Sequence, residues 1–189
     1  MPTLFSRSSR RTSPVPAGTW VVDRAHSRVG FSVKHLGIAT VRGTFEAFDG
    51  ALVVGDDLAS GRITGTIDAA SVNTQEAQRD EHLRSADFFD VAEYPQITLT
   101  ADVLRQRDED EFDIEGELAL HGVSRPITLR AVVHGVETDP WGNERVGIEI
   151  TGELSRGDYG MKFNQVLGSG NVLVSDKVKI SLDVSAVKQ

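Results

Sequence analysis

The chain has 189 residues, a length typical of one domain; 39% of the residues are hydrophobic, 25% are charged and none is cysteine. The lack of cysteine excludes disulfide bonds, thiolate zinc sites and cysteine nucleophiles, and no apolar run reaches the ~18 residues of a membrane-spanning helix. Without such a run we expect that the protein does not span a membrane. The formal net charge of −8 at pH 7 repels phosphate backbones and anionic membrane surfaces, so we expect no nucleic-acid partner.

Residues 1–17, MPTLFSRSSRRTSPVPA, contain three arginines and no acidic residue. The paired Arg10 and Arg11 are not followed by the apolar stretch of about 7–15 residues that an export signal contains. We therefore expect a disordered basic tail over residues 1–17, a single domain over residues 18–189, and a cytoplasmic protein.

From Gly18 onward, apolar and polar residues alternate with a period of two, which predicts strands with one buried and one solvated face. Ile97 and Leu99, for example, alternate with Thr98 and Thr100. Turns rich in Gly, Asp and Pro separate the segments. About eight strands are predicted, two early segments counting as one bent strand, and the segments cover residues 18–23, 28–35, 41–54, 61–71, 96–105, 111–121, 126–137, 144–155 and 176–187.

Many predicted strands are about ten residues long, against a typical five or six, and several contain interior glycines such as Gly43 and Gly116. Glycine weakens a flat strand but permits the strong coiling that a closed barrel needs. The pattern favours an all-β fold, an antiparallel barrel of about eight strands. Such a barrel has room inside for side chains or for one small ligand.

Residues 71–95 are the only long helix-favouring segment of the chain. Asn73 or Thr74 is predicted to cap a helix over residues 75–84, and Asn73 with Glu76 resembles a capping box. The helix contains neither glycine nor proline and has few apolar residues. Its composition is typical of a helix that lies on a surface.

We expect a helical lid near residues 74–90 at one end of the barrel. Ser85 is predicted to cap a second short helical turn that contains Phe88 and Phe89. Together with Tyr94, these rings form the densest aromatic cluster of the chain. The cluster is predicted to plug or floor the barrel end.

Several motifs occur together in the order found in one protein family. They are WVVD at 20–23, HS at 26–27, FSVKHLG at 31–37, VRGTF at 41–45, RDEHL at 79–83, GEL at 116–118, HGVSRPI at 121–127 and SRGDYG at 155–160. On these motifs the chain, from about Gly18 to Val187, resembles the YceI-like, polyisoprenoid-binding family of lipocalin-like proteins.

The resemblance implies an extended lipocalin-like barrel that holds a long isoprenoid or a related amphiphilic lipid in an apolar channel. It also implies a possible homodimer. Many members of the family are exported to the periplasm, whereas no signal peptide is recognised in this sequence.

Inward-facing strand residues are the candidates for contact with an apolar chain. They are Phe31, Val33, Val41, Phe45, Leu99, Ile114, Leu118, Leu129, Ile148 and Ile180. Met161 and Phe163 are further candidates, because a flexible thioether adapts to a chain. Alternatively, all of these side chains fill a solid core, as inward residues do in any small barrel.

Arg42 lies among apolar strand residues and is the candidate for contact with a phosphate or quinone oxygen at the mouth. Alternatively, its charge points outward into solvent. In the lid, Arg79 and Asp80 are expected to pair and to hold the helix on the barrel, with His82 beside them. The five histidines of the chain lack metal-ligand spacing, so we expect no metal and no cofactor.

No nucleophile elbow and no phosphate-binding loop is present in the sequence. The sequence therefore predicts non-catalytic binding or transport of a long-chain isoprenoid, a polyprenyl quinone or a similar amphiphilic lipid. Two alternatives stay open. One is a barrel enzyme of isomerase or cyclase type that uses His26, His35, Arg79 or Asp80 on a hydrophobic substrate, and the other is a solid-cored interaction module.

Overall fold

A computed structural model describes residues 13–56 and 60–189, and these form eleven β-strands, one α-helix and three 3-10 turns. The strands are β1 (Gly18–Val22), β2 (Arg28–His35), β3 (Ala39–Phe45), β4 (Phe48–Val54), β5 (Arg62–Asp68), β6 (Val72–Asn73), β7 (Gln96–Gln106), β8 (Glu111–Leu120), β9 (Val123–Thr138), β10 (Glu144–Ser155) and β11 (Val174–Lys188). The helix is α1 (Ala77–Arg84), and the 3-10 turns are η1 (Arg24–His26), η3 (Ala69–Ser71) and η4 (Arg156–Tyr159).

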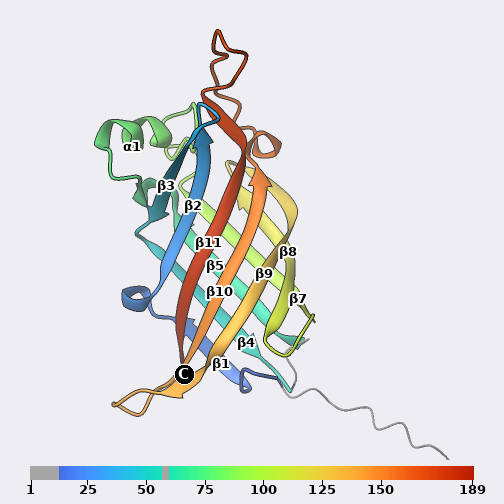
Figure 1. Ribbon diagram of the computed structural model, residues 1–189. Coiled ribbons are helices and arrows are strands. Elements are labelled where there is room, and N and C mark those ends of the chain that lie inside the picture. Colours follow the sequence, from blue (N-terminus) through green and yellow to red (C-terminus); the bar gives the residue numbers. More distant parts are fainter. Residues whose placement is uncertain (1–12, 57–59) are drawn as a thin grey trace, which may run out of the picture.

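Eight strands close into an antiparallel barrel in the order β1-β4-β5-β7-β8-β9-β10-β11, because β11 also pairs with β1. Strand β11 pairs with β1 only at its last residues, from Ala186 to Lys188. Its earlier part pairs with β2, which continues into β3 and β6 beside α1 (Figure 1). The predicted all-β barrel of about eight strands with a helical segment is confirmed.

The predicted strand over residues 41–54 is two strands, β3 and β4, and this part of the prediction is wrong. Phe45 and Phe48 are both buried, although residues three apart in a continuous strand point to opposite faces. The backbone amides of Glu46 and Ala47 donate instead to the Ser71 hydroxyl, at 3.1 and 3.0 Å. The chain therefore bends between β3 and β4, and the two strands join different parts of the sheet.

The predicted strand over residues 61–71 also ends earlier, at Asp68. The Asp68 carboxylate accepts a hydrogen bond from the backbone amide of Ala70 at 2.9 Å and so caps η3. A side-chain cap of this kind offers the backbone an alternative to the sheet, so the strand stops where η3 begins.

Residues 13–17 belong to the folded body rather than to a disordered tail, which corrects the predicted boundary. Val15 has 0% exposure, and the indole N–H of Trp20 donates to the Pro16 carbonyl at 3.0 Å. The predicted tail over residues 1–12 lies outside the described residues.

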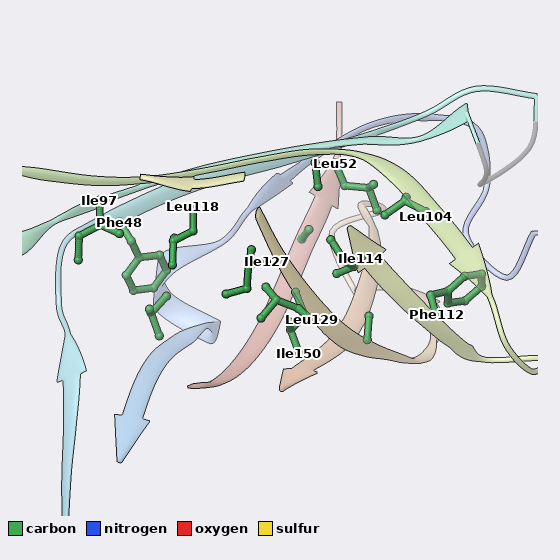
Figure 2. Close-up of a cluster of buried hydrophobic side chains, with 14 of the residues drawn as sticks. Phe48, Leu52, Ile97, Leu104, Phe112, Ile114, Leu118, Ile127, Leu129 and Ile150 are labelled. Carbon is green, nitrogen blue, oxygen red and sulfur yellow. The ribbon is translucent and has the colours of Figure 1, made fainter. Parts of the chain in front are cut away.

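Apolar side chains of β4, β7, β8, β9 and β10 converge in the barrel interior (Figure 2). The neighbouring strands β7 and β8 approach closely at Gly116, where a Cβ atom would lie 2.6 Å from that of Ala101. The register between β7 and β8 shifts after Ala101, which marks a bulge. Glycine therefore permits the bend at this point of the wall.

Candidate functional site

Two neighbouring cavities lie inside the barrel. The first has a volume of about 140 Å³ and is bordered by β4, β5 and the inner faces of β7 to β11. The second has a volume of about 170 Å³ and is bordered by β2, β11, η4 and the segment that follows α1. They share the wall residues Val29, Ile67, Ile97, Leu99, Leu118 and Leu182, so they are adjoining parts of one interior.

Both cavities are apolar. Apart from three wall positions of β4 and β5 (Asp49, Thr64 and Thr66), the first is lined by hydrophobic residues and glycine, and Arg156 is the only charged residue that lines the second. A cavity needs only ~10–15 Å³ to admit one water molecule, so each of these spaces is about ten times that size. The interior is therefore not the solid core of the alternative hypothesis.

Most of the predicted contact residues line these cavities. They are Phe31, Val33, Phe45, Leu99, Ile114, Leu118, Leu129, Ile148, Met161 and Ile180. On the strands, the alternation placed them correctly because every second residue of a barrel strand points inward. Gly43 supports one of them, because a Cβ atom at Gly43 would collide with the Phe31 ring across the β2–β3 pair.

Three predicted contact residues do not line either cavity. Arg42 is exposed on β3, so its outward alternative is the one observed, and Val41 is half-buried outside both linings. Phe163 is also half-buried and packs on other aromatic rings, with centroids 4.9 Å from His82 and 5.3 Å from Phe88.

The lid segment lies beside β3 and β6, at the end of the barrel where the second cavity is found (Figure 1). Helix α1 begins two residues later than predicted, and its N-cap is Glu76, whose carboxylate accepts from the amides of Gln78 and Arg79. Ser85 follows the helix as its C-cap, and Phe88 lies in a hydrogen-bonded turn rather than in a second helix.

Arg79 and Asp80 both bind Thr74 and do not pair with each other, which corrects the predicted ion pair. The buried Asp80 carboxylate accepts from the Thr74 amide at 2.8 Å and from its hydroxyl at 2.5 Å. The Arg79 guanidinium donates to the Thr74 hydroxyl and carbonyl at 2.7 and 2.8 Å. The lid is thus fixed through its connection to β6.

Two lid aromatics reach the second cavity. Phe88 is 8% exposed, and both Phe88 and Phe89 line the cavity wall. Phe89 also packs on Phe45, with ring centroids 5.5 Å apart in an edge-to-face arrangement. His82 contacts Phe88 from outside the cavity and bonds Asp87 at 2.8 Å. The lid therefore contributes aromatic surface to the interior, and its polar residues stay outside.

Arg156 is the functional candidate that the sequence analysis missed. It is 5% exposed, and its guanidinium donates to the carbonyls of Met161, Val174 and Ser175 at 2.8, 3.2 and 3.0 Å. Its Cζ lies 5.9 Å from the centre of the Phe88 ring. No ion pair with a carboxylate is found for it among the described residues, so it places a positive charge at the cavity wall.

Burial lowers the pKa of Arg156, and the charge of Asp176 opposes that shift. An arginine with an ordinary pKa above ~12 stays protonated at neutral pH in spite of such a shift. The only sequence signal for Arg156 was its position in the turn motif at 155–160.

A polar cluster lies outside the cavities, where the β9–β10 hairpin meets η1. Arg145 bonds the carboxylates of Asp23 and Asp139 at 2.7 and 2.8 Å. Hydrogen bonds from Arg145 and from His26 lower the pKa of Asp23 to about 2. At Asp139, burial raises the pKa of the carboxyl. Hydrogen bonds from Asn143 and Arg145 outweigh this effect and hold the pKa well below its usual range.

The lining of both cavities is almost entirely apolar. Among the described residues, no three His, Asp or Glu side chains gather in a way that could hold a metal ion. None of the side chains proposed for the alternative enzyme lines either cavity. In the described ranges, no helix is long and apolar enough to cross a membrane.

A closed eight-stranded antiparallel barrel around an apolar cavity defines a lipocalin-like protein. The model of the YceI-like domain family matches residues 20–186. The chain belongs to this family.

Sequence similarity to named relatives supports the assignment to the YceI-like family. Protein YceI of Escherichia coli O157:H7 is 40% identical over 165 residues, which cover 87% of this chain and 83% of the relative. Protein YceI of Salmonella arizonae is 36% identical over 181 residues, which cover 94% and 91%.

Solved structures show the same fold. The Campylobacter jejuni YCEI protein matches with a TM-score of 0.70 and 32% identity over 88% of this chain and 96% of that protein. A polyisoprenoid binding domain from Saccharophagus degradans matches with a TM-score of 0.70 and 19% identity over 92% and 100%. At that identity, the second comparison shows the fold alone.

Proposed function

We propose that this protein binds a long-chain isoprenoid, such as a polyprenyl quinone, or a similar amphiphilic lipid, and carries it without changing it chemically. The observation that carries the proposal is the pair of adjoining apolar cavities inside the barrel. A ligand that fills both has to be long, narrow and apolar. The polyisoprenoid-binding domain from Saccharophagus degradans, which has this fold, supports the same class of ligand.

The energetics favour such a chain. Burying one methylene group contributes about 0.8 kcal/mol, so one five-carbon isoprene unit contributes roughly 3–4 kcal/mol before ordering costs. A few units therefore give tight binding without a charged contact. The head group needs only one polar neighbour, and Arg156 supplies it in the second cavity in place of the predicted Arg42.

The positions of the titratable groups support binding and transport of the lipid rather than catalysis. General acid–base chemistry needs groups within hydrogen-bond reach of the reacting atoms. His26 is exposed, His35 is half-buried, and neither of them, nor Arg79 or Asp80, lines a cavity. The predicted cytoplasmic location and homodimer remain part of the proposal, and analytical ultracentrifugation tests the homodimer.

Two neighbouring residues of β7 provide a matched test of the ligand site. Leu99 lines both cavities, whereas Thr100 is exposed on the outer face of the wall. Leu99→Trp fills the junction of the cavities with an indole ring and should raise the Kd for geranylgeraniol about tenfold or more, a change of ~1.4 kcal/mol. Thr100→Trp should leave the Kd unchanged. Isothermal titration calorimetry measures both.

Overpacking by the Leu99→Trp indole costs about 1–3 kcal/mol of stability, so circular dichroism must first show a folded variant. Leu99→Ala enlarges the junction and should retain binding, which separates a blocked site from a damaged one. Equal Kd values for the tryptophan variants of Leu99 and Thr100 would contradict an internal site.

A further inference from the structure

Two uncharged loops meet at the end of the barrel that holds the second cavity. Residues 36–41 (LGIATV) and 163–175 (FNQVLGSGNVLVS) contain no charged side chain, in a chain that is 25% charged. The Leu36 amide donates to the Leu173 carbonyl at 3.0 Å, so the loops are bonded to each other. The second loop projects beyond the barrel (Figure 1). We call these two loops the apolar tip.

The apolar tip exposes large hydrophobic side chains. Ile38 is 79% exposed and Val166 is 77% exposed, and Val172, which pairs with Val166 in an isolated bridge, is 39% exposed. Single exposed hydrophobic residues need no explanation, but a group on two bonded loops without charges marks an interaction surface.

The apolar tip is continuous with the ligand site. Val174, near the end of the second loop, lines the second cavity, and Arg156 binds the carbonyl groups of Val174 and Ser175. Val33 of β2, three residues before the first loop begins at Leu36, lines the same cavity. A ligand that passes this end of the barrel therefore passes beside the tip.

The charges around the tip oppose the net charge of the protein. Lys34 and Arg42 flank the first loop and Lys162 precedes the second, and all three are exposed. Within the described part of the chain, none of the three forms an ion pair. Asp176 follows the second loop, with Lys177 next to it. In a protein of net charge −8, most of the charged residues next to the tip in the sequence are therefore positive.

We propose that the apolar tip docks on a lipid bilayer that contains anionic lipids. Ile38 and Val166 insert among the acyl chains, while Lys34, Arg42 and Lys162 lie over the head groups. A second copy of the chain fits this surface less well, because a symmetric contact would oppose two sets of positive charges. Docking would place the second cavity next to the bilayer, in which an isoprenoid dissolves. That last consequence depends on the proposed function, but docking itself does not.

Flotation with vesicles tests the proposal. Wild-type protein should float with vesicles made of equal parts phosphatidylcholine and phosphatidylglycerol, free of isoprenoid, and less so with phosphatidylcholine alone. The double variant Ile38→Asp, Val166→Asp should bind at least tenfold more weakly. Trp141→Asp is the matched control, because Trp141 is 82% exposed in the β9–β10 hairpin at the opposite end of the barrel (Figure 1), and it should bind as wild type.

A separate variant tests how much the positive charges contribute to vesicle binding. Lys34→Glu, Arg42→Glu and Lys162→Glu together should weaken binding to the anionic vesicles and remove most of its dependence on salt. Binding that is unchanged in the double aspartate variant, or lost equally in Trp141→Asp, would overturn the proposal. So would a smaller sedimentation coefficient of the double aspartate variant without vesicles, which would assign the tip to self-association.

A separate measurement distinguishes this proposal from the proposed function. Calorimetric titration with geranylgeraniol, in the absence of vesicles, reports ligand binding alone. Vesicle binding by protein that does not bind geranylgeraniol would support docking and contradict the proposed function. Geranylgeraniol binding by protein that does not bind vesicles would support the proposed function and contradict docking.

Discussion

At the residue scale, Arg156 combines a structural and a chemical role. Its guanidinium holds three backbone carbonyls at the junction of η4 and β11, and it leaves a positive charge at the wall of the second cavity. A buried charge without a carboxylate partner is costly, and an anionic or oxygen-rich head group would offset that cost. We therefore expect the preference for one head group over another to depend most strongly on Arg156.

Substitution of Arg156 should change head-group preference. Wild-type protein is expected to bind geranylgeranyl diphosphate more tightly than geranylgeraniol. Arg156→Gln should reduce this ratio about tenfold, because a charge-assisted hydrogen bond contributes ~1.5–3 kcal/mol, and Arg156→Lys should preserve most of it. Calorimetry with both ligands measures the ratio, and a ratio unchanged in Arg156→Gln would show that the residue is only structural.

Asp23 should make the stability of the fold depend on acid pH. Hydrogen bonds from Arg145 and His26 lower its folded-state pKa from 3.8 to about 2. A depressed folded-state pKa stabilises the protein above the unfolded-state pKa, and this contribution is lost as the pH falls from 3.8 through about 2. Asp23→Asn should therefore be less stable at neutral pH and lose less stability across this window.

Urea unfolding at a series of pH values measures the effect. Asp139 has a depressed pKa too, so Asp23→Asn should flatten the pH dependence only in part. Parallel curves for the wild type and the variant would contradict the role of Asp23.

The period-two alternation predicted most of the lining because inward direction depends mainly on local strand geometry. It predicted Leu99, Leu118 and Ile180 correctly for this reason. Arg156 could not be found in this way. It follows a strand in a 3-10 turn, and its role depends on carbonyl groups up to nineteen residues away.

At the element scale, the sequence predicted the lid helix and the aromatic residues after it, but not how the helix is held. Several side chains near residue 74 have similar capping ability. The choice of Glu76 as the N-cap follows from Asp80, which binds Thr74 at a buried position and fixes the preceding turn. Capping preferences alone do not predict such a contact between residues six apart in the chain.

The segment over residues 13–16 is a second element that local composition misassigned. Its two prolines and its serine are typical of a disordered segment. Val15 nevertheless lines the first cavity, and Pro16 accepts the hydrogen bond from Trp20. The burial of Val15 and the hydrogen bond from Trp20 hold this segment on the barrel.

Removal of residues 1–16 should expose Trp20, which has 0% exposure. We expect its fluorescence emission to move to longer wavelength and the free energy of unfolding to fall by about 1.5 kcal/mol or more, because Val15 is lost from the core. The measurement requires a Trp141→Phe background, since Trp141 is the other of the two tryptophans and is 82% exposed. An unchanged emission spectrum would contradict the packing of this segment.

At the scale of the whole molecule, strand length and glycine content predicted a barrel, and the β1–β11 pairing closes it. Alternation could not predict that β11 pairs with β1 along one part and with β2 along another. This double pairing connects residues far apart in the sequence. It also brings the lid and the apolar tip to one end of the barrel (Figure 1).

The charge distribution is likewise a property of the whole molecule. The net charge of −8 predicted repulsion from anionic membranes. The fold instead places Lys34, Arg42 and Lys162 around two uncharged loops. Net charge alone therefore does not describe the surface beside the cavity.

Native mass spectrometry of protein purified without detergent, followed by solvent extraction, shows directly whether the barrel holds a lipid. We expect one isoprenoid, or a similar amphiphilic lipid, per barrel, present on purification or taken up after incubation with geranylgeraniol. The Leu99→Trp variant should carry less of the ligand than the wild type under the same conditions. If folded wild-type protein still has the mass of the chain alone after incubation, the proposed lipid binding is contradicted.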